Sequence, residues 1–577
     1  MSPFQVIVLA TPVFLLLIAL EFAWGWSRQR RGAGRNTYAL GDTLNSISLG
    51  VLSQLSGVFT QLLAIGIYSL VQAELALWHN DSFWLSLPGF LTALVFYDFC
   101  YYWLHRAGHR SGILWAAHVV HHQSEHYNLS TALRQTSSGS LLGWVFYLPM
   151  AVAGVPPLVF GVVALVDLLY QFWVHTEQVG KLGWFDRVFC SPSNHRVHHA
   201  VNDHYLDRNY GGVLVVWDRL FGTFREEDEP CIYGTRSPLR SWDPLWANAQ
   251  VYWALMQASW RARGWGNKLA VWMMPPGWQP AGQALYTGAE AFSLQAPRFN
   301  PPLRRSVQWF AALQFLLLLQ GVAVVLWFAR AWPLQEVTLW SAALVACYWS
   351  LGTLLQGRLG IGLVLMINTA ALATVCSALG LQTAFFLLKP APLAIAIFLV
   401  AKRLYSTRTS GGFYLLLLLA VTASLAGDVL LMLPGDHFIA GLAAFLGAHL
   451  AYLAMLRQDS PWLPRPAALL VTTGIGVLMY ALLWPGLTAP ALKVAVAVYV
   501  LVIAFMTAQA LGRAAVLGHG RAKALAWGAG IFMLSDTLLA VDRFVQVLPL
   551  ASLWVLASYY LAQVLIVHNA RPAAEND

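Results

Sequence analysis

An almost unbroken apolar run from 307 to 568 constrains the fold of this chain more than any other feature. A helix of about 20 apolar residues is long enough to cross a hydrocarbon core of about 30 Å. Further runs of this kind lie at 4–24, 45–74 and 83–104. Hydrophobic residues make up 58% of the chain and charged residues only 11%, which excludes an ordinary soluble protein. We therefore expect an all-α, polytopic integral membrane protein.

Basic residues at the ends of the apolar runs predict the topology. No positive residue precedes the first run and RQRR at 28–31 follows it, which is the reverse of a secretory signal peptide. The positive-inside rule then places the N-terminus outside and residues 105–138 and 176–300 in the cytoplasm. The stretch 140–175 is expected to enter and leave the membrane on one side as a hairpin. The net charge of +9 thus indicates topology and not nucleic-acid binding.

The second half divides into ten expected membrane helices. They lie near 307–330, 336–356, 359–380, 383–401, 412–433, 437–456, 466–485, 489–511, 525–545 and 550–568. This division places the following basic residues inside: Arg358, Lys402, Arg403, Arg457, Arg465, Arg513, Arg521, Lys523 and Arg571. A multi-pass protein of a bacterial inner membrane is the expected result.

The segment APRFNPPLRRS, residues 296–306, is the expected seam between two modules, 1–300 and 301–577. No internal repeat links the two, because 11 of the 16 histidines lie between 105 and 204. The five cysteines contain no CxxC pair, so neither a disulfide framework nor a thiolate metal site is predicted.

Three histidine boxes stand out in the first module. They are HRAGH (His105 and His109), HVVHH (His118, His121 and His122) and HRVHH (His195, His198 and His199). Spacings of three and four place side chains on one face of a helix, so each box is expected to present two or three imidazoles to one point. Since one zinc site takes only three or four protein ligands, these eight histidines predict two metal ions.

Imidazole suits iron, zinc, copper and nickel about equally, so the residue type alone does not name the metal. His175 in QFWVHTE is placed at the cytoplasmic end of the hairpin, where it can complete the site. His79, His126 and His204 fall outside the pattern and are expected at the surface or in supporting positions. A metal-storing cluster is the alternative, which the fixed spacing of the boxes disfavours.

In this order on a membrane protein, the boxes resemble the fatty acid hydroxylase and sterol desaturase superfamily. The segments YDFCYYWLHRAGH, HVVHHQSEHYNLSTALRQ, QFWVHTE and NHRVHHAVNDHYLDRNYGGVLVVWDRLFGTF most resemble the alkylglycerol monooxygenase family, over about 40–290. The resemblance implies a di-iron centre bound by the eight box histidines and His175. It also implies supporting roles for Asp98, Glu125, Asn128, Arg134, Gln135, Asn209, Tyr210, Asp218 and Arg219. A carboxylate among them could accept the other N–H of a ligand histidine.

The resemblance further implies O2-dependent hydroxylation of the carbon next to a glycerolipid ether oxygen, with two electrons from an external donor. The resemblance implies tetrahydrobiopterin as the donor, and the sequence has no flavin, haem or nicotinamide motif that would supply the electrons internally. Two alternatives keep the same boxes. One is a sterol, fatty acid or carotenoid hydroxylase or desaturase, and the other is a zinc hydrolase without redox chemistry.

Three charged residues lie inside apolar runs of the second module: Lys389 in LLKPAP, Asp428 in LAGDVLLML and Asp536 in FMLSDTLLA. Such residues are costly in a bilayer and tend to be paired, cavity-facing or functional. The structural alternative is an ion pair between Lys389 and one aspartate, with the other aspartate capping a helix. His449 in FLGAHLAY is expected to make only a polar contact between helices.

The segments KPAPLAIAIFLVAKR, SLAGDVLLML, FIAGLAAFLGAHLAY, FMLSDTLLAVDRF and YYLAQVLI, in this order, resemble the lysoplasmalogenase or YhhN family over about 340–570. The resemblance implies hydrolysis of the vinyl ether bond of lysoplasmalogens. Protonation of the outer vinyl carbon gives an oxocarbenium ion that water captures. Asp428 and Asp536 are the candidate acid and water-orienting pair, with Lys389 tuning their charge or contacting the lipid phosphate.

Both resemblances point to glycerol ether lipids within the bilayer. The sequence therefore predicts a bifunctional membrane enzyme, a di-iron monooxygenase that cleaves alkyl ethers fused to a hydrolase that cleaves vinyl ethers. The rival is a C-terminal module that transports or only binds lipid for the oxygenase, with its buried charges marking a path.

Overall fold

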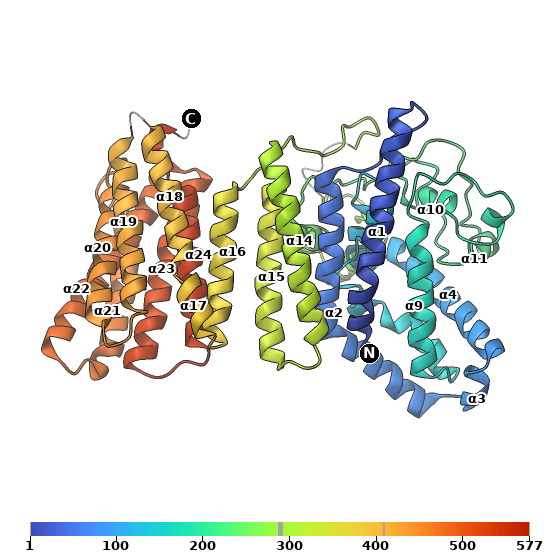
Figure 1. The fold of residues 1–577 in the computed structure, drawn as a ribbon, viewed down its shortest axis with the longest axis horizontal. Helices are drawn as coiled ribbons and strands as arrows, with labels where there is room; N and C mark the ends of the chain where they lie inside the picture. Colours follow the sequence, from blue (N-terminus) through green and yellow to red (C-terminus); the bar gives the residue numbers. More distant parts are fainter. Residues whose placement is uncertain (1, 287–291, 408–409, 576–577) are drawn as a thin grey trace. The chain divides into compact units, whose positions relative to one another are not determined.

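The structure is a computed structural model that describes residues 2–286, 292–407 and 410–575, apart from the side chains of 61–64. Every regular element of this part of the chain is helical (Figure 1), and the only β-type pairings in it are two isolated bridges, Phe189 with Leu214 and Ala200 with Tyr233. Eleven helices are long and apolar enough to cross a membrane. The prediction of an all-α, polytopic membrane protein is confirmed.

The candidate spans begin with α1 (Pro3–Arg30) and continue after residue 300. The later ones are α14 (Arg305–Phe328), α15 (Leu334–Leu355), α16 (Ile361–Ala378), α17 with α18 (Gln382–Leu388 and Ala391–Ser406), α19 (Gly411–Leu430), α20 (Phe438–Leu456), α21 (Pro466–Leu483), α22 (Pro490–Leu517), α23 (Gly520–Phe544) and α24 (Ala551–Asn569). Each of the ten helices predicted between 307 and 568 coincides with one of these spans. α2 (Leu40–Leu75) adds a twelfth span if its two limbs, bent by 47°, are taken together.

Two expected elements of the first half differ from the structure. The run at 83–104 forms α4 (Leu87–Arg110), which does not reach the hydropathy of a span, because Asp98 and several tyrosines interrupt its apolar residues. The first limb of the expected hairpin at 140–175 is a series of short turns, among them α8 (Leu148–Val152). Only the second limb, α9 (Pro157–Trp173), is a continuous apolar helix. Proline and glycine between α8 and α9 break the chain there.

The chain divides into two compact units, Met1–Val337 with Leu351–Arg358, and Thr338–Ser350 with Leu359–Asp577. In the first unit α14 packs against α1 and α2, so this division falls later than the seam expected at 296–306. α4 packs against α5 (Gly112–His122) and α9, and α5 packs against α12 (Pro244–Arg261) and α13 (Trp265–Met273). This arrangement brings the ends of α4 and α5, which carry histidines, together.

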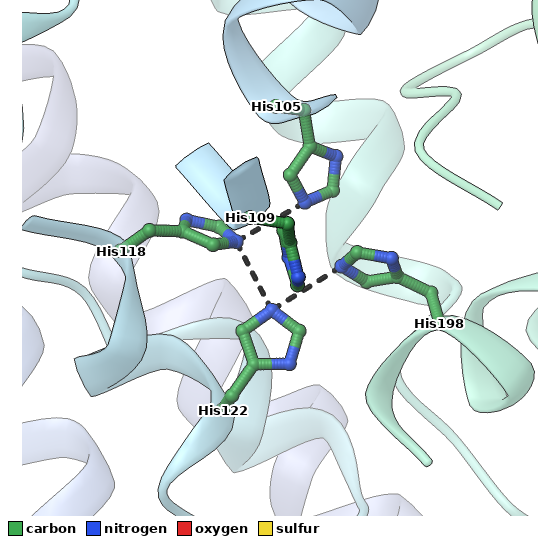
Figure 2. A group of neighbouring side chains, drawn as sticks. All are labelled: His105, His109, His118, His122 and His198. Carbon is green, nitrogen blue, oxygen red and sulfur yellow. Dashed lines mark hydrogen bonds between the residues drawn. The ribbon is translucent and has the colours of Figure 1, made fainter. Parts of the chain in front are cut away.

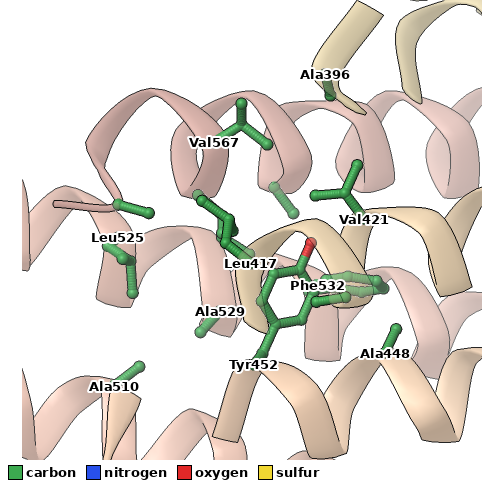
Figure 3. Packing of buried hydrophobic residues seen from close by; sticks show 14 of the residues in the cluster. Ala396, Leu417, Val421, Ala448, Tyr452, Ala510, Leu525, Ala529, Phe532 and Val567 are labelled. Atoms are coloured by element: carbon green, nitrogen blue, oxygen red, sulfur yellow. The ribbon is translucent and has the colours of Figure 1, made fainter. Parts of the chain in front are cut away.

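The second unit is a bundle in which α19 packs on α20 and α23 packs on α24. Tyr452 and Phe532 lie at the centre of its core (Figure 3), among small side chains such as Ala448 and Ala529. All four are at most 1% exposed. Small residues let helix backbones approach closely, which is how helices associate where lipid supplies no hydrophobic driving force.

Candidate functional site

Three helices and one turn carry the nine predicted ligand histidines into one region of the first unit. His105 and His109 lie in the last turns of α4, and the HVVHH box ends α5. The HRVHH box ends α10 (Pro192–His199), and His175 follows α9 by two residues. Eight of the nine are buried, and His118 is half-buried. Burying so many imidazoles costs free energy unless their ring nitrogens have hydrogen-bond partners or bind a common ligand.

α10 is a short helix whose eight residues are all buried. It begins where the Ser191 hydroxyl accepts the amide hydrogen of Asn194, a common N-terminal cap. Arg196, in the middle of α10, forms a two-armed pair with Glu227 at 2.7 and 2.8 Å and donates to the carbonyl of Thr176. Because Thr176 adjoins His175, this arginine ties the third box to the turn that carries the ninth histidine.

The nine histidines form two groups. The first comprises His105, His109, His118, His122 and His198, and the second comprises His121, His175, His195 and His199. Within each group the nitrogens that could bind a metal all lie within 4.8 Å of one another. Figure 2 shows the five rings of the first group pointing toward one another from α4, α5 and α10. Two groups of five and four donors can hold two metal ions.

Each HxxHH box presents two of its three imidazoles to one group and the third to the other. In α5, His118 and His122 enter the first group and His121 enters the second. In α10, His195 and His199 enter the second group and His198 enters the first. Residues four apart share a helix face, whereas a residue between them points partly aside. Each HxxHH box therefore contributes histidines to both groups and so fixes the distance between them.

Backbone carbonyls orient four of the rings. In each case Nδ1 donates to a main-chain oxygen, which can only accept, and Nε2 is left with its lone pair facing the group. The four pairs are His105 with Tyr210, His121 with Arg134, His175 with Gln171 and His198 with Arg208, at 2.8–2.9 Å. A partner of this kind fixes the tautomer and the ring orientation of a metal ligand.

His121 and His175 show that the group suits a cation. Their Nε2 atoms lie 3.1 Å apart, although both rings use their Nδ1 hydrogens on carbonyls. Burial lowers the pKa of His121 to about 4 and that of His175 well below its usual value, so both rings are neutral near pH 7. Neither Nε2 then has a hydrogen to share. Two lone pairs at this distance repel each other unless a metal ion lies between them, so the donor set fits a metal.

Two buried aspartates support the chain that follows the third box. Asp98 of α4 accepts hydrogen bonds from the amides of Val213 and Leu214 and from the Trp217 indole, at 2.7–3.0 Å. Asp218 accepts from the amides of Tyr210 and Gly211 at 2.7 and 2.8 Å. Both carboxylates therefore hold the loop whose Tyr210 carbonyl orients His105.

One carboxylate that the sequence did not single out reaches a histidine directly. Asp207 lies 3.5 Å from Nδ1 of His109 and 3.6 Å from Arg110. Its backbone has a φ of +57°, an uncommon conformation for a residue other than glycine.

Arg134, one of the supporting residues expected from the sequence, is fully buried. It donates to the Val120 carbonyl and the Asn45 side chain.

The remaining expected supports hold backbone segments around the groups. The Asn209 side chain donates to the carbonyls of Asn194 and Arg225 and accepts the Arg225 amide. Asn128 caps a helical turn. Arg219 donates to the Arg187 carbonyl. Glu125 accepts the Phe299 amide, and Gln135 donates to the Ala132 carbonyl. His79, His126 and His204 lie outside both groups, in agreement with their exclusion from the boxes.

In the second unit the two predicted aspartates are each held by a tyrosine. Asp428 accepts a hydrogen bond from Tyr559 at 2.7 Å and interacts electrostatically with Lys389 and Asp536. Asp536 accepts from the Tyr499 hydroxyl at 2.6 Å. The aspartates thus share one region of the core, each held by its own tyrosine.

Asp536 also contacts His449, whose Nε2 lies 3.1 Å from its carboxylate and 3.0 Å from the Tyr499 hydroxyl. His449 is fully buried and makes the polar contact between helices that the sequence suggested, joining α20 to α22 and α23. An uncharged tyrosine or histidine in an apolar helix gives little sequence signal. The only available signal for His449 was a polar side chain inside a membrane span.

Asp536 and Tyr499 line an apolar cavity between α19, α20, α21, α22 and α23. Most of its other lining side chains are aliphatic or aromatic, among them Phe438, Leu442 and Phe544. Asp428 is not among the lining residues, so of the two predicted aspartates only Asp536 faces the cavity. The cavity can accept a hydrocarbon chain beside a carboxyl group.

Comparison with known proteins gives a separate match for each half. The fatty acid hydroxylase family matches residues 90–223 and the YhhN family matches residues 384–570. Alkylglycerol monooxygenase of Homo sapiens is 36% identical over 334 residues, which cover 57% of this chain and 73% of the relative. The Danio rerio protein of the same name is 36% identical over 356 residues, or 60% and 77% of the two chains.

Lysoplasmalogenase TMEM86B of Homo sapiens is 34% identical over 178 residues, which cover 30% of this chain and 72% of the relative. No solved structure is significantly similar to the chain. Both resemblances predicted from the sequence are confirmed. The chain therefore belongs to the alkylglycerol monooxygenase family of fatty acid hydroxylases through its N-terminal half and to the lysoplasmalogenase, or YhhN, family through its C-terminal half.

Proposed function

We propose that this protein is a bifunctional membrane enzyme that degrades ether lipids. Its first module is an O2-dependent monooxygenase that cleaves alkyl ether glycerolipids, and its second hydrolyses the vinyl ether bond of lysoplasmalogens. The observation that carries the proposal is that two separate stretches of one chain match families whose names both refer to glycerol ether lipids. We assign the two activities to residues 1–300 and 301–577.

The nine histidines of the two groups would hold two iron ions. Iron bound there supplies activation of O2 for hydroxylating the carbon next to the ether oxygen, with two electrons from an external donor such as tetrahydrobiopterin. The chain contributes neutral imidazoles, because burial keeps them deprotonated, and it keeps their Nε2 atoms inward through the four backbone carbonyls. The hydroxylated carbon is a hemiacetal, which breaks down to a fatty aldehyde and a glycerol.

The histidine groups are proposed to face the cytoplasm of a bacterial cell. The support for this orientation is the distribution of basic residues at helix ends, which follows the positive-inside rule. The substrate would then be a lipid of the inner membrane that presents its ether bond near the cytoplasmic interface.

In the second module, Asp536 is the proposed acid that protonates the outer vinyl carbon. As the proton leaves, a carboxylate forms, and hydrogen bonds from Tyr499 and His449 stabilise that negative charge. Water then adds to the oxocarbenium ion, and the resulting hemiacetal releases a fatty aldehyde and a glycerophospho head group. Asp428 and Lys389 are proposed to set the charge of this region and to orient the water.

Mass spectrometry of the products tests both activities in one preparation. Purified, iron-loaded protein is given an alkylglycerol and then a lysoplasmalogen, each with and without a pterin. We expect fatty aldehyde from both lipids, with O2, iron and pterin required only for the alkylglycerol. Absence of aldehyde from both lipids, in folded protein that has bound iron, would refute the proposal.

A further inference from the structure

Two basic residues of the second unit depart from the charge pattern of the others. α22 and α23 have Arg513 and Arg521 near their cytoplasmic ends, so their opposite ends, which carry Lys493 and Arg543, face the other side. The positive-inside rule accounts for the cytoplasmic charges and not for these two. Arg543 is 42% exposed and lies in the last turn of α23. Its position calls for a different explanation.

The cavity that contains Asp536 extends to the same end of the bundle. Its lining includes Phe438, the first residue of α20, and Leu483 and Phe544, the last residues of α21 and α23. These three helix ends lie on the non-cytoplasmic side in the predicted topology. The cavity therefore leads from the carboxyl group of Asp536 toward that interface.

Arg543 lies at the mouth of this cavity. Its guanidinium carbon is 4.2 Å from the centre of the Phe438 ring and 6.0 Å from that of Phe544, and both rings line the cavity. Nη2 of Arg543 also pairs with Asp436 at 3.0 Å. The Asp436 side chain is 76% exposed, so an anion arriving from the interface can displace it.

The spacing along α23 matches the length of a lysolipid head group. Asp536 and Arg543 are seven positions apart, which places them on one helix face about 10 Å apart along the axis. In a lysoplasmalogen, seven covalent bonds separate the phosphorus from the outer vinyl carbon, a reach of about 8 Å when extended, and the long side chain of Arg543 can cover the remaining distance. An acid at Asp536 and a cation at Arg543 can therefore engage both ends of this unit at once.

We propose that Arg543 binds the phosphate of the lysolipid while the vinyl ether lies beside Asp536 and the hydrocarbon chain fills the apolar cavity. This assignment rests on the proposed hydrolase function. A guanidinium can offer a phosphate two parallel N–H donors, a geometry that lysine cannot reproduce. The site would thus select lysolipids with a phosphate over neutral alkenylglycerols.

The test compares two vinyl ether substrates, a lysoplasmalogen and the 1-alkenylglycerol that lacks its phosphate. For Arg543→Ala we expect KM for the lysoplasmalogen to rise by about tenfold, the scale of one charge-assisted contact, with kcat unchanged. KM for the alkenylglycerol should not change. Arg457→Ala is the matched control, because Arg457 lies over the Trp462 ring at the opposite end of α20. It should leave both KM values unchanged.

Asp436→Asn separates phosphate binding from a structural ion pair. If Arg543 binds phosphate, removing its competitor should lower KM for the lysoplasmalogen. If the pair only stabilises the fold, this variant should instead lose thermal stability as Arg543→Ala does, with equal effects on both substrates. That second result would overturn the proposal, and melting curves of both variants check that they fold.

Binding of a 1-acyl lysophospholipid distinguishes failure of this site from failure of the hydrolase. The analogue has the same phosphate but neither an alkyl nor a vinyl ether, so its affinity is independent of turnover by either module. Tighter binding to the wild type than to Arg543→Ala supports the phosphate site even if no lysoplasmalogen is hydrolysed. Equal binding to both, with lysoplasmalogen still hydrolysed by the wild type, overturns the site and leaves the hydrolase intact.

Discussion

The histidine groups of the first unit and the aspartate region of the second hold their buried polar side chains in place in different ways. In the first, nine imidazoles come from residues 105–199, and four of their outer nitrogens donate to backbone carbonyls. In the second, each aspartate is held by a tyrosine of another helix, Asp428 by Tyr559 and Asp536 by Tyr499. Local spacing builds the first region, and helix packing builds the second.

The sharpest test of this separation is His121→Ala, which should abolish the monooxygenase and leave the hydrolase unchanged. Loss of a supporting partner alone costs roughly 10- to 100-fold in metal affinity or activity, and loss of a ligand should cost more. Bound metal is measured by elemental analysis beside both activities. His204→Ala is the control, because His204 is 36% exposed, pairs with Asp228 and Glu229, and lies outside both histidine groups. Loss of hydrolase activity in His121→Ala would show that the two regions depend on each other.

Asp536→Asn should have the converse effect, lowering kcat of the vinyl ether hydrolase by roughly 100- to 1,000-fold, a typical contribution of general acid catalysis. The metal content should stay at the wild-type value. Asp542→Asn, on the same helix, serves as the control, since Asp542 accepts the Leu548 amide and does not line the cavity. Full turnover in folded Asp536→Asn would remove the aspartate from the mechanism.

Asp207→Asn compares a side-chain partner with main-chain partners inside the first unit, because Asp207 is the carboxylate beside His109 whereas four other histidines donate to backbone carbonyls. Removing its charge should weaken metal retention by about tenfold, the low end for a partner of a ligand histidine, because Asp207 is 36% exposed. Competition with a chelator measures the retention. Asp203→Asn is a suitable comparison, as Asp203 pairs with Arg236 and touches no ligand histidine. Identical chelation curves for Asp207→Asn and the wild type would contradict a role at His109.

Tyr499→Phe should give an effect no larger than that of Asp207→Asn. It removes one hydrogen bond to the Asp536 carboxylate, and such bonds to charged groups are worth about 1.5–3 kcal/mol. Because His449 still donates to the same oxygen, we expect only the low end, a decrease in kcat of about tenfold. A similar loss in Tyr480→Phe, whose hydroxyl bonds the Lys493 carbonyl at 3.1 Å, would mean that the effect is not specific to the acid.

The sequence identified the ligand candidates of the first unit because HxxxH and HxxHH are local patterns. It could not assign His121 and His198 to their groups, since that depends on how α4, α5 and α10 are oriented. The carbonyl partners could not be predicted from the sequence, because every residue has a main-chain oxygen. Asp207 could not be predicted either, because its contact with His109 depends on the fold. Asp98 made the prediction of a membrane span wrong. Its charge allows it to hold the loop after the third box, but the same charge lowers the hydropathy of α4 below that of a span.

In the second half of the chain, the apolar runs predicted ten helices because a bilayer requires long uncharged segments. The charges of Lys389, Asp428 and Asp536 stood out against that background. Tyr499 and Tyr559 did not, because tyrosine is common in membrane helices and its role appears only when α22 and α24 are placed beside their aspartates. Contacts between remote helices carry no periodic signal in one sequence.

The carbonyl acceptors of His105, His121, His175 and His198 have a consequence for how the proposed metal centre can be altered. A side-chain acceptor can be exchanged by a single codon change, whereas a peptide oxygen is present whatever residue occupies the position. Substitutions at Tyr210, Arg134, Gln171 and Arg208 therefore leave the acceptors of these four candidate ligands in place, provided that the main chain keeps its path. Engineering that aims to retune the proposed metal has to reshape the backbone there or change Asp207, the carboxylate beside His109.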